Sequence, residues 1–124
     1  MKVVIIGPGA IGCLFAAWIS QSGTETFLLD KSTKRASFLS HHGIIVEEPD
    51  GKIIIIKIPV LTDPKCLREA DFICVCVKAY DTESVIKHAG KYLHGKAIVS
   101  LQNGMGNIEK ILAKVPNIFP ICAL

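Results

Sequence analysis

Blocks of apolar residues with two different periods alternate along the chain, and they predict strands and helices in turn. The β-branched run at residues 3–6 is typical of a buried parallel strand, which we place at about 2–6. After it, apolar residues recur three and four positions apart, so the segment at about 10–22 is predicted to be a helix. The predicted buried stripe of this helix consists of Ile11, Leu14, Phe15, Trp18 and Ile19. We therefore expect Trp18 in the core.

The alternation continues to the end of the chain. Further strands are predicted at about 25–29, 60–61, 72–77, 97–101 and 118–121. Helices are predicted between them, at about 32–39, 64–70 and 82–91, and from 107 to the residue before Pro116. Ser32, Asp63 and Asn107 are the expected N-caps, because short polar side chains accept hydrogen bonds from the first helical N–H groups.

One segment interrupts this order. Two β runs at 44–48 and 53–58 are joined by Pro49-Asp50-Gly51, which predicts a hairpin because Asp-Gly favours a tight turn. The run at 53–56 is four isoleucines, apolar on both faces. If one face is left uncovered, we expect this hairpin to promote association.

Six strands linked by helices predict an α/β fold. Right-handed crossovers favour a Rossmann-like, doubly wound, mostly parallel sheet in the order 3-2-1-4-5-6, with the hairpin at about 44–58 as an excursion. The 124 residues suffice for one domain, which we expect to be a single unit over residues 1–124.

Composition narrows the class of protein. Half of the residues are hydrophobic, yet no apolar run approaches the length of a membrane span and no signal-peptide pattern is present, so we expect no membrane partner. A net charge of +3 is too small to indicate nucleic-acid binding. Five cysteines, an odd number, favour free thiols in a reducing compartment, and their spacing predicts no metal site. A cytoplasmic location is therefore expected.

The first chemical signal is the G-x-G-x-x-G loop at residues 7–12, between the first strand and the first helix. Gly7 permits a tight turn, Gly9 lets the backbone approach a pyrophosphate, and Gly12 lets helix and strand pack closely. The loop is completed by Pro8, Ala10 and Ile11. We predict that all six residues bind a dinucleotide, which makes residues 1–124 a dinucleotide-binding domain.

The residues after the second strand give conflicting signals about the cofactor. Asp30 stands where an acid can accept hydrogen bonds from the adenosine ribose, which favours NAD. Lys31, Lys34 and Arg35 follow at once, and cations there suit the 2′-phosphate of NADP. Lys34 and Arg35 are equally typical of a solvated helix face. Asp30 and Lys31 are taken as cofactor-binding candidates.

Polar or glycine-rich segments follow four of the predicted parallel strands, at 7–12, 30–31, 78–80 and 102–106. The carboxyl ends of parallel strands meet at one sheet edge, where ligands of doubly wound folds bind. Lys78 and Asn103 are therefore candidate cofactor-binding residues, although a surface lysine and a turn asparagine are the simpler interpretations.

The chain resembles the ketopantoate reductase (2-dehydropantoate 2-reductase) family in three motifs: residues 7–12, Val77-Lys78-Ala79-Tyr80 and residues 101–106. The resemblance implies NADPH-dependent reduction of ketopantoate, a small 2-keto acid, to pantoate. It also implies that Lys78 contacts the cofactor, that Lys31 faces the 2′-phosphate, and that Asn103 lies where cofactor and substrate meet. The expected cofactor is NADP, with NAD left open by Asp30.

The family also has a C-terminal helical domain that supplies a catalytic lysine and a glutamate. We expect that domain to be absent from these 124 residues, so no catalytic residue is named and efficient turnover is not expected. Surface that helices normally cover would then be exposed, and such surface favours self-association into a homo-oligomer. Two alternatives are a stand-alone nucleotide-sensing regulatory module and a related 2-keto acid or opine dehydrogenase domain.

Overall fold

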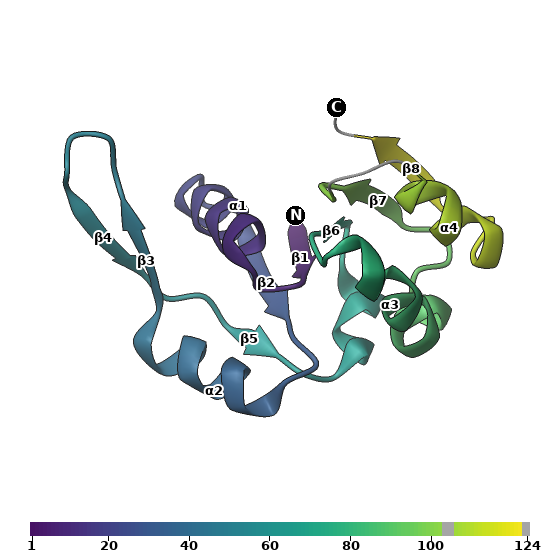
Figure 1. The fold of residues 1–124 in the computed structure, drawn as a ribbon, viewed down its shortest axis with the longest axis horizontal. Coiled ribbons are helices and arrows are strands. Elements are labelled where there is room, and N and C mark those ends of the chain that lie inside the picture. Colours follow the sequence, from purple (N-terminus) through teal and green to yellow (C-terminus); the bar gives the residue numbers. More distant parts are fainter. Residues whose placement is uncertain (103–105, 123–124) are drawn as a thin grey trace.

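A computed structural model describes residues 1–102 and 106–122 of the chain. Its main sheet has six parallel strands in the order β5-β2-β1-β6-β7-β8 (Figure 1). The strands are β1 (Lys2–Ile6), β2 (Glu25–Leu29), β5 (Val60–Leu61), β6 (Phe72–Val75), β7 (Ala97–Ser100) and β8 (Phe119–Cys122). Numbered without the hairpin, this is the predicted order 3-2-1-4-5-6, and the predicted doubly wound fold is confirmed.

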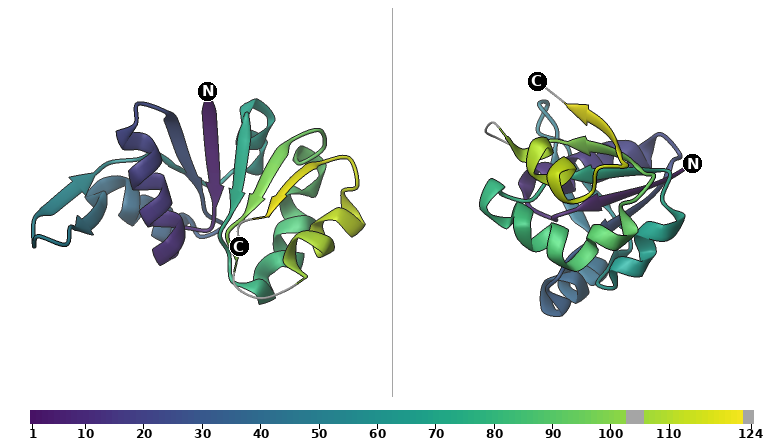
Figure 2. Two further views of the ribbon diagram at one scale, coloured as in Figure 1. Left: turned by 90° about the horizontal axis from the view of Figure 1, so that it is seen from above. Right: turned by 90° about the vertical axis from the view of Figure 1, so that its right-hand side faces the viewer.

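Helices lie on both faces of the sheet (Figures 1 and 2). The α-helices are α1 (Ala10–Gln21), α2 (Thr33–His42), α3 (Thr82–Ala89) and α4 (Asn107–Lys114), and the 3₁₀ helices are η1 (Pro64–Glu69), η2 (Ala79–Asp81) and η3 (Gly90–Tyr92). One core lies between the sheet and α3, α4 and η1, and a second lies between the sheet and α1. β1 serves both, since Val4 and Ile6 belong to the first and Val3 and Ile5 to the second. None of the described helices is long and apolar enough to cross a membrane.

The buried face of α1 differs from the prediction. Trp18 is 53% exposed and lies edge-on to Phe15, so its predicted place in the core is wrong. The helix instead buries its small residues Gly12, Ala16 and Ala17. Small side chains let the helix backbone approach the sheet closely, and they are favoured over large ones where the helix crosses β1 and β2.

Two predicted helices differ from the structure, one in its type and one in its N-cap. The segment after Asp63 forms a 3₁₀ helix, although Asp63 does cap it by accepting a hydrogen bond from the N–H of Lys65 at 2.9 Å. Asn107 is not the N-cap of α4. Gly106 takes that position in the left-handed region at φ 85°, and Asn107 is the first helical residue. Its buried side chain accepts a hydrogen bond from the hydroxyl of Thr82 instead.

The predicted hairpin forms a sheet of its own, with β3 (Ile44–Glu47) antiparallel to β4 (Ile53–Ile56). It protrudes from the body of the molecule beside α1 (Figure 2). Ile44, Val46 and Ile56 join the core under α1, so the hairpin is anchored along one face.

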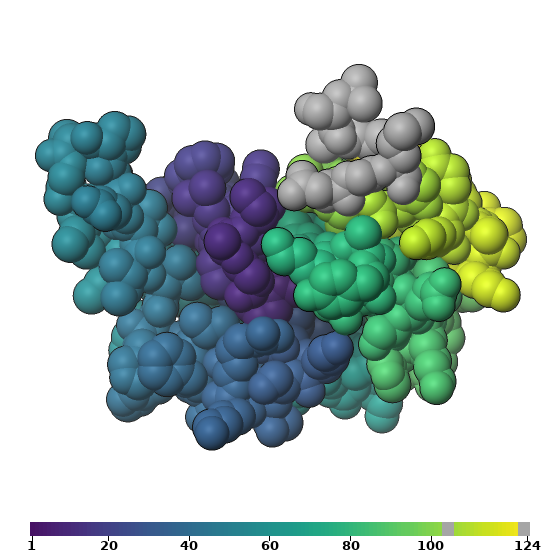
Figure 3. Space-filling model, in the orientation of Figure 1, coloured from purple at the N-terminus to yellow at the C-terminus, as the bar shows by residue number. Residues whose placement is uncertain are grey.

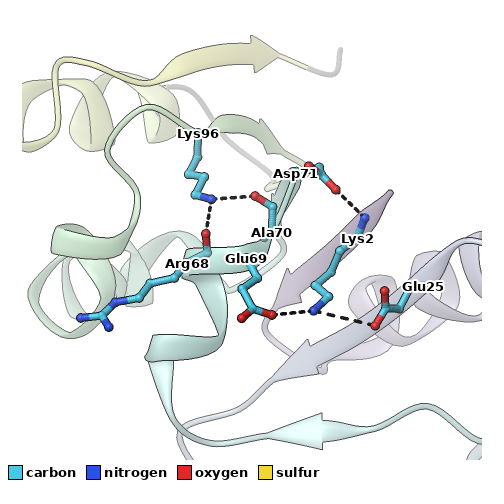
Figure 4. Close-up of polar contacts among 7 residues, drawn as sticks. All are labelled: Lys2, Glu25, Arg68, Glu69, Ala70, Asp71 and Lys96. Carbon is cyan, nitrogen blue, oxygen red and sulfur yellow. Dashed lines mark hydrogen bonds and ion pairs between the residues drawn. The ribbon is translucent and has the colours of Figure 1, made fainter.

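Polar contacts fix the amino-terminal edge of the sheet (Figure 4). The Lys2 ammonium donates to Glu69 at 3.0 Å and lies 3.8 Å from a carboxylate oxygen of Glu25. The Lys96 ammonium donates to the carbonyls of Arg68 and Ala70, at 2.6 and 2.8 Å. These contacts join η1 to β1 and to the start of β7, at the end of the sheet opposite the loops that follow β1, β2 and β6.

Candidate functional site

A hollow of about 350 Å³ lies at the carboxyl ends of β1, β2 and β6. We call it the main hollow. Its walls come from residues 6–9, 29–31, 76–78, 80–81, 84–85 and 88–89, with Arg35, Thr62 and Pro64. The segments that contribute, α2 and the starts of α1 and α3, meet near the centre of the face shown in Figure 3. It is the position at which doubly wound sheets bind their ligands.

Gly7 and Gly12 are required by the fold itself. Gly7 has φ 100°, and a Cβ built on it would lie 2.8 Å from the Val77 side chain. A Cβ on Gly12 would lie 2.0 Å from the carbonyl oxygen of Gly7. Both contacts are shorter than packed atoms allow, so these glycines let β1, β6 and α1 meet closely.

Neither packing nor backbone conformation requires a glycine at position 9. Its backbone is extended, with φ −76° and ψ −170°, a conformation that any residue adopts. A Cβ built there would meet nothing within 4 Å, and the residue faces the main hollow. Gly9 is also the N-cap of α1, whose first turn holds no acidic side chain. Open space at a helix N-terminus, beside free N–H groups, suits a phosphate.

Asp30 is bound on both oxygens by protein groups. The Arg35 guanidinium donates to the carboxylate through Nε at 2.6 Å and through Nη2 at 2.7 Å. The backbone N–H of Ser32 donates to it at 3.0 Å. Asp30 is only 2% exposed, whereas about half of the Arg35 side chain is exposed.

The same contacts determine the charge of the pair. Burial acts to raise the pKa of Asp30, but hydrogen bonds from Arg35 and Ser32 outweigh it, and the pKa lies below its usual value. The hydrogen bond to Asp30 in turn raises the pKa of Arg35. Both groups are therefore ionised at neutral pH, and the negative charge of Asp30 is neutralised within the pair.

The structure brings most of the predicted cofactor residues together. Gly7, Pro8, Gly9, Asp30, Lys31 and Lys78 line the main hollow. The Lys31 ammonium lies 3.7 Å from an Asp81 oxygen, and Lys78 directly precedes η2. Ala10, Ile11 and Gly12 form the first turn of α1 and do not line the main hollow. Asn103 lies outside the described residues.

The sequence did not point to several wall residues, which are Thr62, Asp81, Ser84 and His88, or to Arg35 as a member of the site. Tyr80, from the predicted polar segment 78–80, also lines the hollow. The signal that could have identified Arg35 is its spacing from Asp30. Ser32 accepts a hydrogen bond from the Arg35 N–H and so starts α2, which turns the arginine back toward the strand end.

A partly buried chain of polar side chains lies at the carboxyl end of β7. The Ser100 hydroxyl donates to Gln102, the Gln102 amide donates to the Thr82 hydroxyl at 2.7 Å, and Thr82 donates to Asn107. It joins the end of β7 to the starts of α3 and α4. These hydrogen bonds link Gln102 to Asn107 through Thr82.

The cysteines near the main hollow are neutral thiols. Burial raises the pKa of Cys13, and it raises the pKa of Cys76 to about 12. The Cys13 thiol donates to the Pro8 carbonyl oxygen at 3.4 Å. Within the described residues, no group of three or more His, Cys, Asp or Glu side chains could hold a metal ion.

Known proteins are similar to this chain in sequence and in fold. The family model described as ketopantoate reductase PanE/ApbA matches residues 3–123. A 2-dehydropantoate 2-reductase of Halobacterium salinarum is 34% identical over 116 residues, which cover 94% of this chain and 38% of the relative. The chain thus spans well under half the length of this relative.

Solved structures agree. A PanE/ApbA family ketopantoate reductase from Ralstonia eutropha superposes with a TM-score of 0.83 at 26% identity, covering 98% of this chain and 40% of that one. A D-mandelate dehydrogenase solved with NADH and anilino(oxo)acetate reaches 0.80 at 28% identity, covering 95% and 39%. The family match takes in nearly every residue, from β1 to the end of β8, and so the chain belongs to the ketopantoate reductase PanE/ApbA family.

Proposed function

We propose that the main hollow binds a nicotinamide dinucleotide, with its pyrophosphate over the start of α1. The observation that carries this is Gly9, which the fold does not need and which leaves open space beside the N–H groups of a helix N-terminus. On this proposal residues 1–124 are the dinucleotide-binding domain of a 2-dehydropantoate 2-reductase-like oxidoreductase. Such an enzyme reduces ketopantoate to pantoate with NADPH.

Each predicted residue has a role in this proposal. Residues 7–12 hold the pyrophosphate, and Lys78, which lines the hollow at the end of β6, contacts the cofactor. Asn103 is proposed to face both cofactor and substrate. Hydride transfer to a ketone leaves an alkoxide that must be protonated, and we assign no residue of this chain to that step.

We propose further that NADP is preferred over NAD. The carboxylate of Asp30 is buried and held by Arg35, so it is poorly placed to accept hydrogen bonds from ribose hydroxyls. The walls hold three cations, Lys31, Arg35 and Lys78, against two acids, Asp30 and Asp81. Arg35 pairs with Asp30 and Lys31 lies 3.7 Å from Asp81, so the walls keep a net positive charge. A 2′-phosphate gains from that balance, because planar guanidinium groups bind phosphate through paired hydrogen bonds.

Calorimetric titration of the chain with NADPH and NADH tests both proposals. We expect tighter binding of NADPH, and we expect Arg35→Ala to weaken NADPH about tenfold with a smaller effect on NADH. Lys34→Ala is the matched control, since Lys34 is an exposed cation on the same helix and lies outside the walls. Equal affinities that Arg35→Ala leaves unchanged would refute the preference for NADP. No binding of either dinucleotide by the folded chain would refute the dinucleotide site.

A second candidate is the binding domain of a related 2-keto acid dehydrogenase. It is favoured by the fold of the D-mandelate dehydrogenase, which was solved with NADH and anilino(oxo)acetate. Titrating ketopantoate and anilino(oxo)acetate into the dinucleotide-loaded chain separates the two. Heat of binding with anilino(oxo)acetate alone would favour the second candidate.

A further inference from the structure

The outward face of the β3–β4 hairpin is an exposed apolar stripe. Residues alternate between the two faces of a hairpin, and Ile45, Ile53 and Ile55 point away from the core. They are 67%, 64% and 61% exposed. Ile45 and Ile55 are direct cross-strand partners, and Ile53 is opposite Glu47. Large apolar side chains gathered on a protruding element are typical of an interaction surface.

Opposite charges stand at the two ends of this stripe. Glu47 shares its cross-strand row with Ile53, next to the turn. Lys57 lies at the root, where the Cβ of Gly43 would be 3.0 Å from the Ile55 side chain and 3.3 Å from that of Lys57. Gly43, Ile55 and Lys57 therefore share the outward face. We call this set, with Ile45, Ile53 and Glu47, the hairpin face.

We propose that the hairpin face binds the hairpin face of a second copy of this chain, in a symmetric dimer. A twofold axis between the two sheets and perpendicular to the strands reverses the strand direction. Row Ile45–Ile55 then meets its own copy, and the turn end of each hairpin meets the root of the other. Glu47 comes over Gly43 of the partner subunit, which has no side chain, and beside Lys57 of the partner subunit. The same ion pair forms twice.

A second copy fits this face because the face is complementary to itself. Its apolar centre and its opposite charges match only when the strands run in opposite directions, and the twofold axis supplies that arrangement. Three isoleucines per copy are less surface than a permanent dimer buries, so the association is weak and depends on concentration. The inference is independent of the dinucleotide proposal, since the hairpin contributes no residue to the main hollow.

Charge reversal followed by mixing tests the proposal. Lys57→Glu gives a hairpin face with two acidic ends, and Glu47→Lys gives one with two basic ends. By sedimentation equilibrium, we expect each variant alone to dimerise at least tenfold more weakly than the native chain, because both ion pairs become repulsive. An equimolar mixture is expected to form a heterodimer at least as tight as the native dimer, since both pairs are then attractive.

Two further variants make the result decisive. Lys52→Glu changes the charge of the same hairpin by the same amount but lies off the hairpin face, so it should dimerise like the native chain. Ile45→Thr keeps a β-branched side chain and should weaken the dimer without a change in charge. Circular dichroism confirms folding in each case. A monomeric native chain at millimolar concentration, or a mixture no tighter than its components, would overturn the proposal.

Discussion

Gly9 and Gly12 stand three residues apart in one glycine motif, yet their substitution should have opposite consequences. Gly9→Val places a side chain in open space on an extended backbone, so the free energy of unfolding should fall by no more than about 1 kcal/mol, the cost of an apolar N-cap. Dinucleotide affinity should fall below detection, because the side chain occupies the proposed pyrophosphate position. Chemical denaturation and calorimetric titration measure the two quantities.

Gly12→Ala should instead destabilise the fold by about 3 kcal/mol, because its Cβ would lie 2.0 Å from the Gly7 carbonyl oxygen. The two variants thus distinguish a glycine kept for a ligand from one kept for packing. The assignment of Gly9 fails if Gly9→Val lowers stability as much as Gly12→Ala.

The Asp30–Arg35 pair gives a pH dependence of known sign. The folded pKa of Asp30 lies below its unfolded value, so the stabilisation is complete above about pH 4 and is lost as pH falls through the folded pKa. Asp30→Asn should cost about 2 kcal/mol at pH 7, because charged hydrogen bonds from Arg35 are lost. It should also flatten the loss of stability below about pH 4.

Urea denaturation between pH 3 and pH 7 measures both effects. Glu83→Gln is the control, because this carboxylate in α3 is exposed, whereas Asp30 is buried. Parallel pH profiles for the native chain and Asp30→Asn would contradict the assigned ionisation.

At the scale of single residues, the sequence predicted that Asp30 and Lys31 belong to the site, but not which charged side chains pair there. Asp30 and Lys31 were predicted from their position after the second strand, and both line the main hollow. The spacing of Arg35 from Asp30 indicates that the two could pair, but whether they meet depends on the angle between β2 and α2, which local sequence does not specify. The conflict between the NAD and NADP signals therefore depends on how α2 is oriented relative to β2.

Among the secondary-structure elements, α1 gives the sharpest prediction. Ala16 is fully buried against the sheet, so Ala16→Leu should overfill a close contact and cost about 3 kcal/mol. Trp18→Ala should cost about 1 kcal/mol, since it removes an exposed ring and one edge-on contact with Phe15. Denaturation followed by circular dichroism compares them. A larger loss of stability in Trp18→Ala than in Ala16→Leu would instead support the core position that the periodicity predicted for Trp18.

Apolar periodicity could not orient α1, because this helix is apolar on more than one face. Large residues mark one stripe and small residues another, and the sheet selects the small ones, Ala16 and Ala17. The hairpin was predictable for a different reason. The turn signal at Asp50-Gly51 between two β-branched runs predicts the pairing of its strands, and the side that the core covers had to come from the structure.

For the whole molecule, the strand order followed from the sequence because crossover handedness leaves few topologies. Once that order is set, the loops after β1, β2 and β6 must meet at one edge, and Gly9 and Lys78 both line one hollow there. The shape of the hollow was not predictable. It depends on how deeply α3 packs, through buried residues such as Thr82.

Because the walls of the main hollow come from both halves of the sheet, the site exists only in the folded chain. A ligand that binds the folded state alone stabilises it by mass action, by about 2.7 kcal/mol at a hundred times its dissociation constant. The melting temperature of the native chain should therefore rise steadily with the logarithm of NADPH concentration. Gly9→Val should start from a similar or slightly lower melting temperature and show no rise. A rise of equal size in both would mean that NADPH binds away from α1, even if the native chain binds it tightly.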